Sequence, residues 1–143
     1  KVPNDQYFCL VGNEGHRLEE VFGDASNVIG KCILPPYPRE MGTYIPSALE
    51  KSAYELSKVD FTEKLKDTHT SLAIQTAREL SVKTAYVVGY DGYNGSAMGQ
   101  KEHELFLENN YLFTKARESG LKLISLTLSS YESLTQDSVF ARL

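Results

Sequence analysis

The chain has 143 residues, of which 41% are hydrophobic and 24% charged, so it has the length and composition of one folded domain. Its 15 basic and 19 acidic residues give a net charge of −4 without a basic cluster, which disfavours a nucleic-acid platform. No apolar run approaches the roughly 20 residues that a membrane-spanning helix needs, so we expect no membrane contact.

The start of the chain and its cysteines indicate the cellular location of the protein. The sequence begins KVPN, without an initiator methionine, and no signal-like stretch follows. We therefore expect a C-terminal piece of a longer, cytoplasmic protein. Cys9 and Cys32 lie in apolar, strand-like runs and are expected to be buried free thiols rather than a disulfide or a reactive pair. Two cysteines and three scattered histidines provide no metal-ligand spacing, so we expect no metal in this chain.

The first half of the chain consists of apolar runs separated by turn residues. Residues 35–42 contain three prolines, which fix the backbone and predict a stiff, extended loop. Around this loop the pattern predicts a strand over 6–11, a helix over 16–22, a strand over 28–34, a helix over 45–52 and a short strand within 54–61.

The second half has a clearer pattern. A helix capped by Asp67 or Thr70 is predicted to extend to Leu80. It is followed by a strand over 84–88, a helix over 101–119 that ends before Gly120, and a strand over 121–128. Strands and helices that alternate through short connections are typical of parallel sheets. We therefore predict that residues 1–143 form a single, small three-layer α/β domain of Rossmann-like type with a mostly parallel sheet.

Ligands of an open parallel sheet bind beyond the carboxyl ends of its strands. Four loops follow predicted strands, at 12–17, 35–42, 89–96 and 129–133, and they share one rim if all four strands are parallel. Candidate ligand-binding residues on these loops are Asn13, Arg17, Arg39, Asp91, Tyr93, Asn94 and Tyr131, and the same loops also carry His16, Ser129 and Ser130.

The loop after residue 88 is the most informative. Three glycines in residues 89–95 allow backbone N–H groups to approach a ligand closely. Asp91 lies just past the strand end, where a carboxylate can accept a hydrogen bond from a ribose or sugar hydroxyl. Alternatively, Asp91 and Asn94 only cap turns of their own backbone. The spacing Gly-x-x-Gly-x-x-Gly differs from the dinucleotide fingerprint, so NAD binding is weakly supported.

Two arginines on the other loops are candidates for binding an anion. Arg39 lies in the proline-rich loop, where a guanidinium can bind a phosphate or carboxylate through two hydrogen bonds, or can pair with Glu40. Arg17 follows a glycine-rich turn at a helix start, and it either binds an anion or pairs with Glu14 or Glu20. No Ser/His/Asp or Cys/His set and no pair of carboxylates indicates a catalytic centre.

Residues 71–93, which end in VGYDGY, resemble the C-terminal region of bacterial aldolase-type proteins. Those proteins carry an N-terminal barrel of the HMG-CoA lyase and 4-hydroxy-2-oxovalerate aldolase kind. The resemblance covers residues 67–131 well and residues 6–45 loosely. It implies that this chain is an accessory domain of a lyase, with the barrel domain of the same chain as its partner. The divalent metal and its Asp and His-x-His ligands belong to the barrel, so these 143 residues are expected to hold no cofactor and to have no turnover alone.

The same segment also resembles Rossmann-like, sialyltransferase-like sugar-binding domains. That resemblance implies that Asp91 and Asn94 lie near a nucleotide or sugar pocket, although the Gly-Pro-Ser nucleotide loop of those domains is absent here. The function expected first is an accessory domain that binds a small anionic or sugar-like ligand. The alternatives are a glycosyltransferase-like, nucleotide-sugar-binding domain and a structural or oligomerisation domain.

Overall fold

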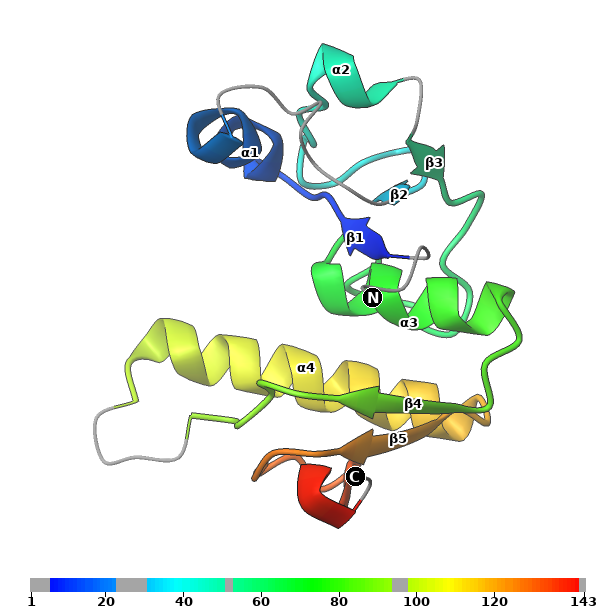
Figure 1. The fold of residues 1–143 in the computed structure, drawn as a ribbon, viewed down its shortest axis with the longest axis vertical. Helices are drawn as coiled ribbons and strands as arrows, with labels where there is room; N and C mark the ends of the chain where they lie inside the picture. The colour runs from blue at the N-terminus through cyan, green and yellow to red at the C-terminus, as the bar shows by residue number, and fades with distance from the viewer. Residues whose placement is uncertain (1–5, 23–30, 51–52, 94–97, 142–143) are drawn as a thin grey trace. The chain divides into compact units, whose positions relative to one another are not determined.

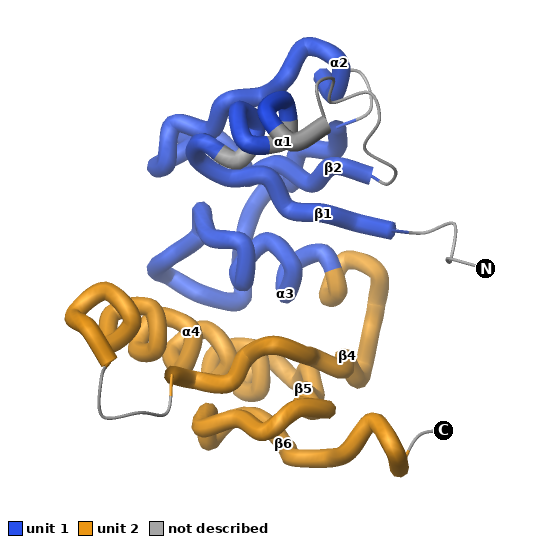
Figure 2. The backbone as a smooth tube through the Cα atoms, turned by 60° about the vertical axis from the view of Figure 1, so that its left-hand side comes forward, with its two compact units in different colours: residues 1–76 blue, residues 77–143 orange. Residues whose placement is uncertain are grey.

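The computed structural model describes residues 6–22, 31–50, 53–93 and 98–141. The chain divides into two compact units, residues 1–76 and residues 77–143 (Figure 2). Each unit contains its own three-stranded sheet, and every strand pair in both sheets is parallel. The predicted α/β class is therefore confirmed.

The sheet of the first unit has the order β1-β2-β3, with β1 at Tyr7–Cys9, β2 at Lys31–Leu34 and β3 at Tyr54–Glu55. Phe8 lies opposite Cys32 in the ladder, and Cys9 lies opposite Ile33. Residues paired in a parallel ladder point to the same face, so Cys9 and Cys32 point to opposite faces of the sheet. Both are free thiols, and Cys32 is fully buried.

Three helices follow the turns that the sequence predicts. Helix α1 covers Glu14–Phe22, and α2 covers Ser47–Glu50 directly after Pro46. Helix α3, at His69–Glu79, crosses the boundary between the units. Its cap is Thr68, not Asp67 or Thr70. The Thr68 hydroxyl accepts the Ser71 N–H at 3.1 Å, and the Ser71 hydroxyl accepts the Thr68 N–H at 3.1 Å, which is the reciprocal arrangement of a capping box.

The second unit contains β4 at Thr84–Val87, β5 at Lys122–Ser125 and β6 at Thr135–Gln136, in the order β4-β5-β6. Helix α4, at Gln100–Glu118, lies along β4 and β5 (Figure 1). It buries one apolar stripe, made of Leu112, Phe113 and Ala116.

Taken by itself, each sheet has the strand order of one half of a doubly wound α/β fold, β3-β2-β1 in the first unit and β4-β5-β6 in the second. This agreement supports the Rossmann-like description of the chain. The expected single rim becomes two rims, because the strands belong to two sheets. The loops after β1 and β2 lie on the first sheet, and those after β4 and β5 lie on the second.

Candidate functional site

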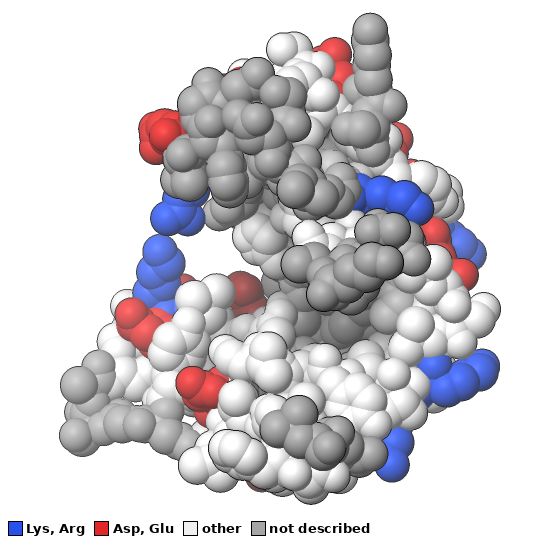
Figure 3. Space-filling model, viewed as in Figure 1, with Lys and Arg blue, Asp and Glu red and all other residues white. Residues whose placement is uncertain are grey.

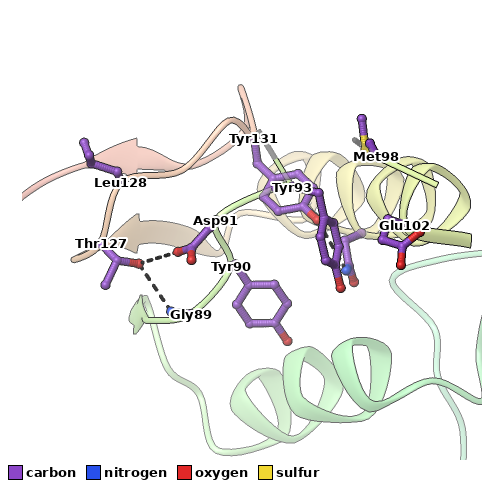
Figure 4. Close-up of a pocket in the computed structure, with 11 residues that line it drawn as sticks. Gly89, Tyr90, Asp91, Tyr93, Met98, Glu102, Thr127, Leu128 and Tyr131 are labelled. Carbon is purple, nitrogen blue, oxygen red and sulfur yellow. Dashed lines mark hydrogen bonds between the residues drawn. The ribbon is translucent and has the colours of Figure 1, made fainter. Parts of the chain in front are cut away.

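A cavity of about 1070 Å³ lies at the carboxyl ends of β4 and β5 (Figure 4). Its walls come from the loop after β4, the loop after β5 and one side of α4. This is the position at which parallel sheets bind ligands. The cavity is lined by Gly89, Tyr90, Asp91, Gly92, Tyr93, Met98, Glu102, Asn109, Thr127, Leu128 and Tyr131.

The path of the loop after β4 depends on glycine at two positions. Gly89 and Gly92 have φ values of +78° and +84°, in the left-handed region that other residues rarely adopt. Gly92 is also buried, and a Cβ there would lie 3.0 Å from the Cβ of Ser130 and 3.1 Å from Cε2 of Phe106. The carbonyl of Asp91 accepts the N–H of Ser130 at 3.0 Å, which joins the two loops directly. The glycine spacing therefore fixes the position of Asp91.

The Asp91 carboxylate is held by one neighbour and otherwise exposed. Its Oδ1 accepts a hydrogen bond from the Thr127 hydroxyl at 3.4 Å, and the same hydroxyl accepts the N–H of Gly89 at 3.3 Å (Figure 4). Thr127 follows β5, so the contact crosses between the loops of two neighbouring strands. The carboxylate is thus aligned from another loop and has lone pairs left for a ligand.

Aromatic rings form one wall of the cavity. Tyr131 is buried, stacks on Phe106 at 4.8 Å between ring centroids, and meets Phe113 edge-on at 5.1 Å. Burial raises the pKa of the Tyr131 hydroxyl, whose oxygen accepts the Asn109 side-chain N–H at 3.4 Å. Tyr93 is 48% exposed, and its ring lies beside that of Tyr131 (Figure 4). Tyr93 therefore has surface to offer a ligand, while Tyr131 is fixed in place.

The charge of the cavity has one sign. Asp91 and Glu102 line it, and no lysine or arginine does so among the described residues. On the face drawn in Figure 3, by contrast, acidic and basic side chains are interspersed, with no continuous patch of either sign among the described residues. Within the described ranges no group of three His, Cys, Asp or Glu residues is arranged to hold a metal ion.

The structure brings three predicted site residues together: Asp91, Tyr93 and Tyr131 all line this cavity. Asn94 lies outside the described residues. Met98, Glu102, Asn109 and Thr127 also line the cavity and were not predicted. The sequence could have indicated Glu102 and Asn109, because both lie in the helix predicted to follow the glycine-rich loop.

The other three predicted residues, Asn13, Arg17 and Arg39, belong to the first unit and do not line this cavity. Asn13 and Arg17 are exposed. The Asn13 carbonyl accepts the backbone N–H groups of His16 and Arg17, in the first turn of α1.

Arg39 is already engaged within its own unit. Its Nε donates to the Pro35 carbonyl at 3.2 Å, and Nη1 donates to the Tyr37 hydroxyl at 3.1 Å. Its Nη2 forms an ion pair with Glu55, not with Glu40. The guanidinium also lies 4.2 Å from the centroid of the Tyr37 ring. Arg39 thus joins the loop after β2 to the end of β3, and its role as an anion ligand stays a prediction.

No protein-family profile, curated protein or solved structure matches the chain. None of the helices in the described segments is long and apolar enough to cross a membrane.

Proposed function

We propose that the second unit binds a small, neutral, polyhydroxylated ligand of the sugar class in the cavity beyond β4 and β5. We further propose that the chain is an accessory domain of a cytoplasmic, aldolase-type lyase and has no turnover of its own. The observation that carries the ligand proposal is the lining of the cavity. It combines aromatic rings, two carboxylates and an amide, with no cation among the described residues.

A sugar matches these groups one by one. Sugar hydroxyls are hydrogen-bond donors, and the carboxylates of Asp91 and Glu102 are acceptors only. The C–H faces of a sugar ring are apolar and can pack on the exposed ring of Tyr93. A volume of about 1070 Å³ leaves room for more than one sugar ring.

An anionic ligand fits the cavity less well. Two unit charges of like sign 4 Å apart repel by about 4 kcal/mol at the effective dielectric typical of a protein surface. A phosphate or carboxylate between Asp91 and Glu102 meets that repulsion with no described cation to offset it. Of the two expected ligand classes, the sugar-like class is therefore favoured over sugar phosphates, 2-oxo acids and nucleotides.

The accessory role is supported by the resemblance of residues 71–93 to the C-terminal region of aldolase-type proteins. In that arrangement the barrel domain performs the lyase chemistry. The cytoplasmic location is part of the same proposal, and free cysteines are typical of a reducing compartment.

Thermal unfolding and calorimetric titration with a ligand panel test the proposal. The panel holds neutral mono- and disaccharides, sugar phosphates, CMP- and UDP-sugars, 2-oxo acids and coenzyme A. A ligand at about 100 times its Kd stabilises the fold by about 2.7 kcal/mol, which raises the Tm by roughly 5–11 °C. Asp91→Asn and Glu102→Gln should abolish the shift. Glu104→Gln is the matched control, since it lies on the same helix but does not line the cavity.

Each outcome supports or contradicts one part of the proposal. A shift with neutral sugars alone supports it, whereas a shift with CMP- or UDP-sugars alone favours the glycosyltransferase-like alternative. No shift across the whole panel contradicts ligand binding and leaves a structural or oligomerisation role. Retro-aldol turnover by the 143-residue chain contradicts the accessory role.

A further inference from the structure

The first unit has a second cavity, of about 300 Å³, which the proposed function does not use. It lies at the carboxyl ends of β2 and β3. The loop after β2 contributes Pro36 and Glu40, the segment after β3 contributes Ser57 and Lys58, and the turn before α3 contributes Lys66 and Asp67. It therefore occupies, on the first sheet, the position that the larger cavity occupies on the second.

Asp67 is the unusual residue of this cavity. Only 5% of it is exposed, yet it is an aspartate. Its Oδ2 accepts the backbone N–H of Met41 at 2.7 Å. Its Oδ1 is also buried and has no hydrogen-bond partner among the described residues. Buried carboxylate oxygens nearly always have a donor, so this oxygen calls for one that the described chain does not supply.

Asp67 lies just before the start of a helix. Helix α3 begins two residues later, at His69, and the N-terminal end of a helix attracts negative charge. Carboxylate oxygens form their strongest hydrogen bonds with charged N–H donors, such as an ammonium group. A primary ammonium is thus the group that suits Oδ1.

The two lysines that line the cavity, Lys58 and Lys66, indicate which second charge the ligand carries. Lys66 is partly buried and has no ion-pair partner within the described ranges, whereas Lys58 pairs with Asp60 at 2.8 Å. Arg39 precedes the lining residue Glu40 in the sequence, but its guanidinium forms an ion pair with Glu55. Lys66 is therefore the cation best placed to receive an anion. The lining holds Glu40 and Asp67 against Lys58 and Lys66, so its charges cancel, unlike those of the larger cavity.

We propose that this cavity binds a small zwitterion of the α-amino-acid class. The ligand's ammonium donates to Oδ1 of Asp67, and its carboxylate pairs with the ammonium of Lys66. A volume of about 300 Å³ is at the small end of ligand pockets and suits a molecule of this size. The inference is independent of the sugar site, because it concerns a different unit and a lining of opposite character.

Isothermal titration of the 143-residue chain with the standard amino acids tests this proposal, with chemical-shift mapping of residues 57–67 as a second readout. Alanine has two matched probes: ethylamine carries only the ammonium, and propionate carries only the carboxylate. Binding of at least one amino acid is expected, with each one-charge analogue of the binding amino acid at least about tenfold weaker. Asp67→Asn and Lys66→Gln should each weaken binding about tenfold or more, while the neighbouring Lys64→Gln leaves it unchanged.

Three results would overturn the proposal. The first is that no amino acid binds, which means that the unpartnered Oδ1 does not mark a ligand site. The second is that one-charge analogues bind as tightly as the amino acid, which means that the two charges are not recognised together. The third is native affinity in Lys66→Gln, a variant that retains the Asp67 contact to Met41 and so tests the site even if Asp67→Asn fails to fold.

Discussion

Replacing Gly92 by alanine should destabilise the second unit by a predictable amount. An L-residue at a left-handed φ costs roughly 1–2 kcal/mol, and Gly92 has a φ of +84°. The new methyl group would also lie 3.0 Å from the Cβ of Ser130 and 3.1 Å from Cε2 of Phe106. Both neighbours are packed in place, and overpacking of this kind costs about 1–3 kcal/mol. The expected loss for Gly92→Ala is therefore about 2–5 kcal/mol.

Gly89→Ala is the matched control for that prediction. Gly89 has nearly the same φ, +78°, but a Cβ there meets no atom within 4 Å. Its expected loss is about 1–2 kcal/mol, from the backbone alone. The difference between the two variants isolates the overpacking against Ser130 and Phe106.

Urea unfolding followed by far-UV circular dichroism measures both losses, since the chain has no tryptophan for fluorescence. Equal losses in the two variants would refute the packing argument, because the backbone cost is common to both. A loss below that of the control would show that the Ser130 loop moves aside freely. In that case the two loops do not hold Asp91 in place.

Three further predictions concern other parts of the chain. Thr68→Ala should lower the unfolding free energy by about 0.5–2 kcal/mol in urea titrations through loss of the α3 cap, and an unchanged midpoint would contradict that assignment. Burial raises the pKa of Cys9 to about 11 and of Cys32 to about 12, so above pH 9 the unfolded chain loses thiol protons that the folded chain keeps. Stability should then fall with rising pH by up to about 1.4 kcal/mol per pH unit per thiol, and a Cys9→Ala, Cys32→Ala protein should show a shallower fall in pH-dependent unfolding. Glu102→Lys should give the larger cavity affinity for glucose 6-phosphate, about tenfold or more above native by calorimetry, and no gain would contradict the charge argument.

Element order could be predicted from the sequence because it depends on local patterns. The strand at 84–88 and the helix at 101–119 are found within one or two residues, at Thr84–Val87 and Gln100–Glu118. Strand β6, at Thr135–Gln136, was missed, since two exposed polar residues have no apolar pattern to detect. The cap of α3 was misplaced by one or two residues, because Asp67, Thr68 and Thr70 are all capping types. Only the Thr68–Ser71 hydrogen bonds distinguish them.

The division into two sheets could not be predicted, because it depends on which strand edges pair. Periodicity shows that a segment is a strand but not which neighbour it joins. The same limit applied to the site. Asp91 and Tyr131 were expected together because the loops after all four predicted strands were expected to share one rim, and these two residues do line one cavity. Arg39 was expected either to bind an anion or to pair with Glu40, the adjacent residue. The β2–β3 pairing brings Glu55 to it instead of Glu40.

The two cavities indicate how one type of sheet edge can select different ligands. Both lie at the carboxyl ends of parallel strands, so backbone topology alone does not distinguish them. Their side chains do: the larger cavity has carboxylates and aromatic rings without a described cation, whereas the smaller one has equal numbers of acids and bases around a buried aspartate. A neutral polyol satisfies the first lining and a zwitterion the second, and neither ligand supplies the groups that the other cavity requires. Cross-titration of both ligand classes against Asp91→Asn and Asp67→Asn should therefore show that each substitution affects only its own ligand.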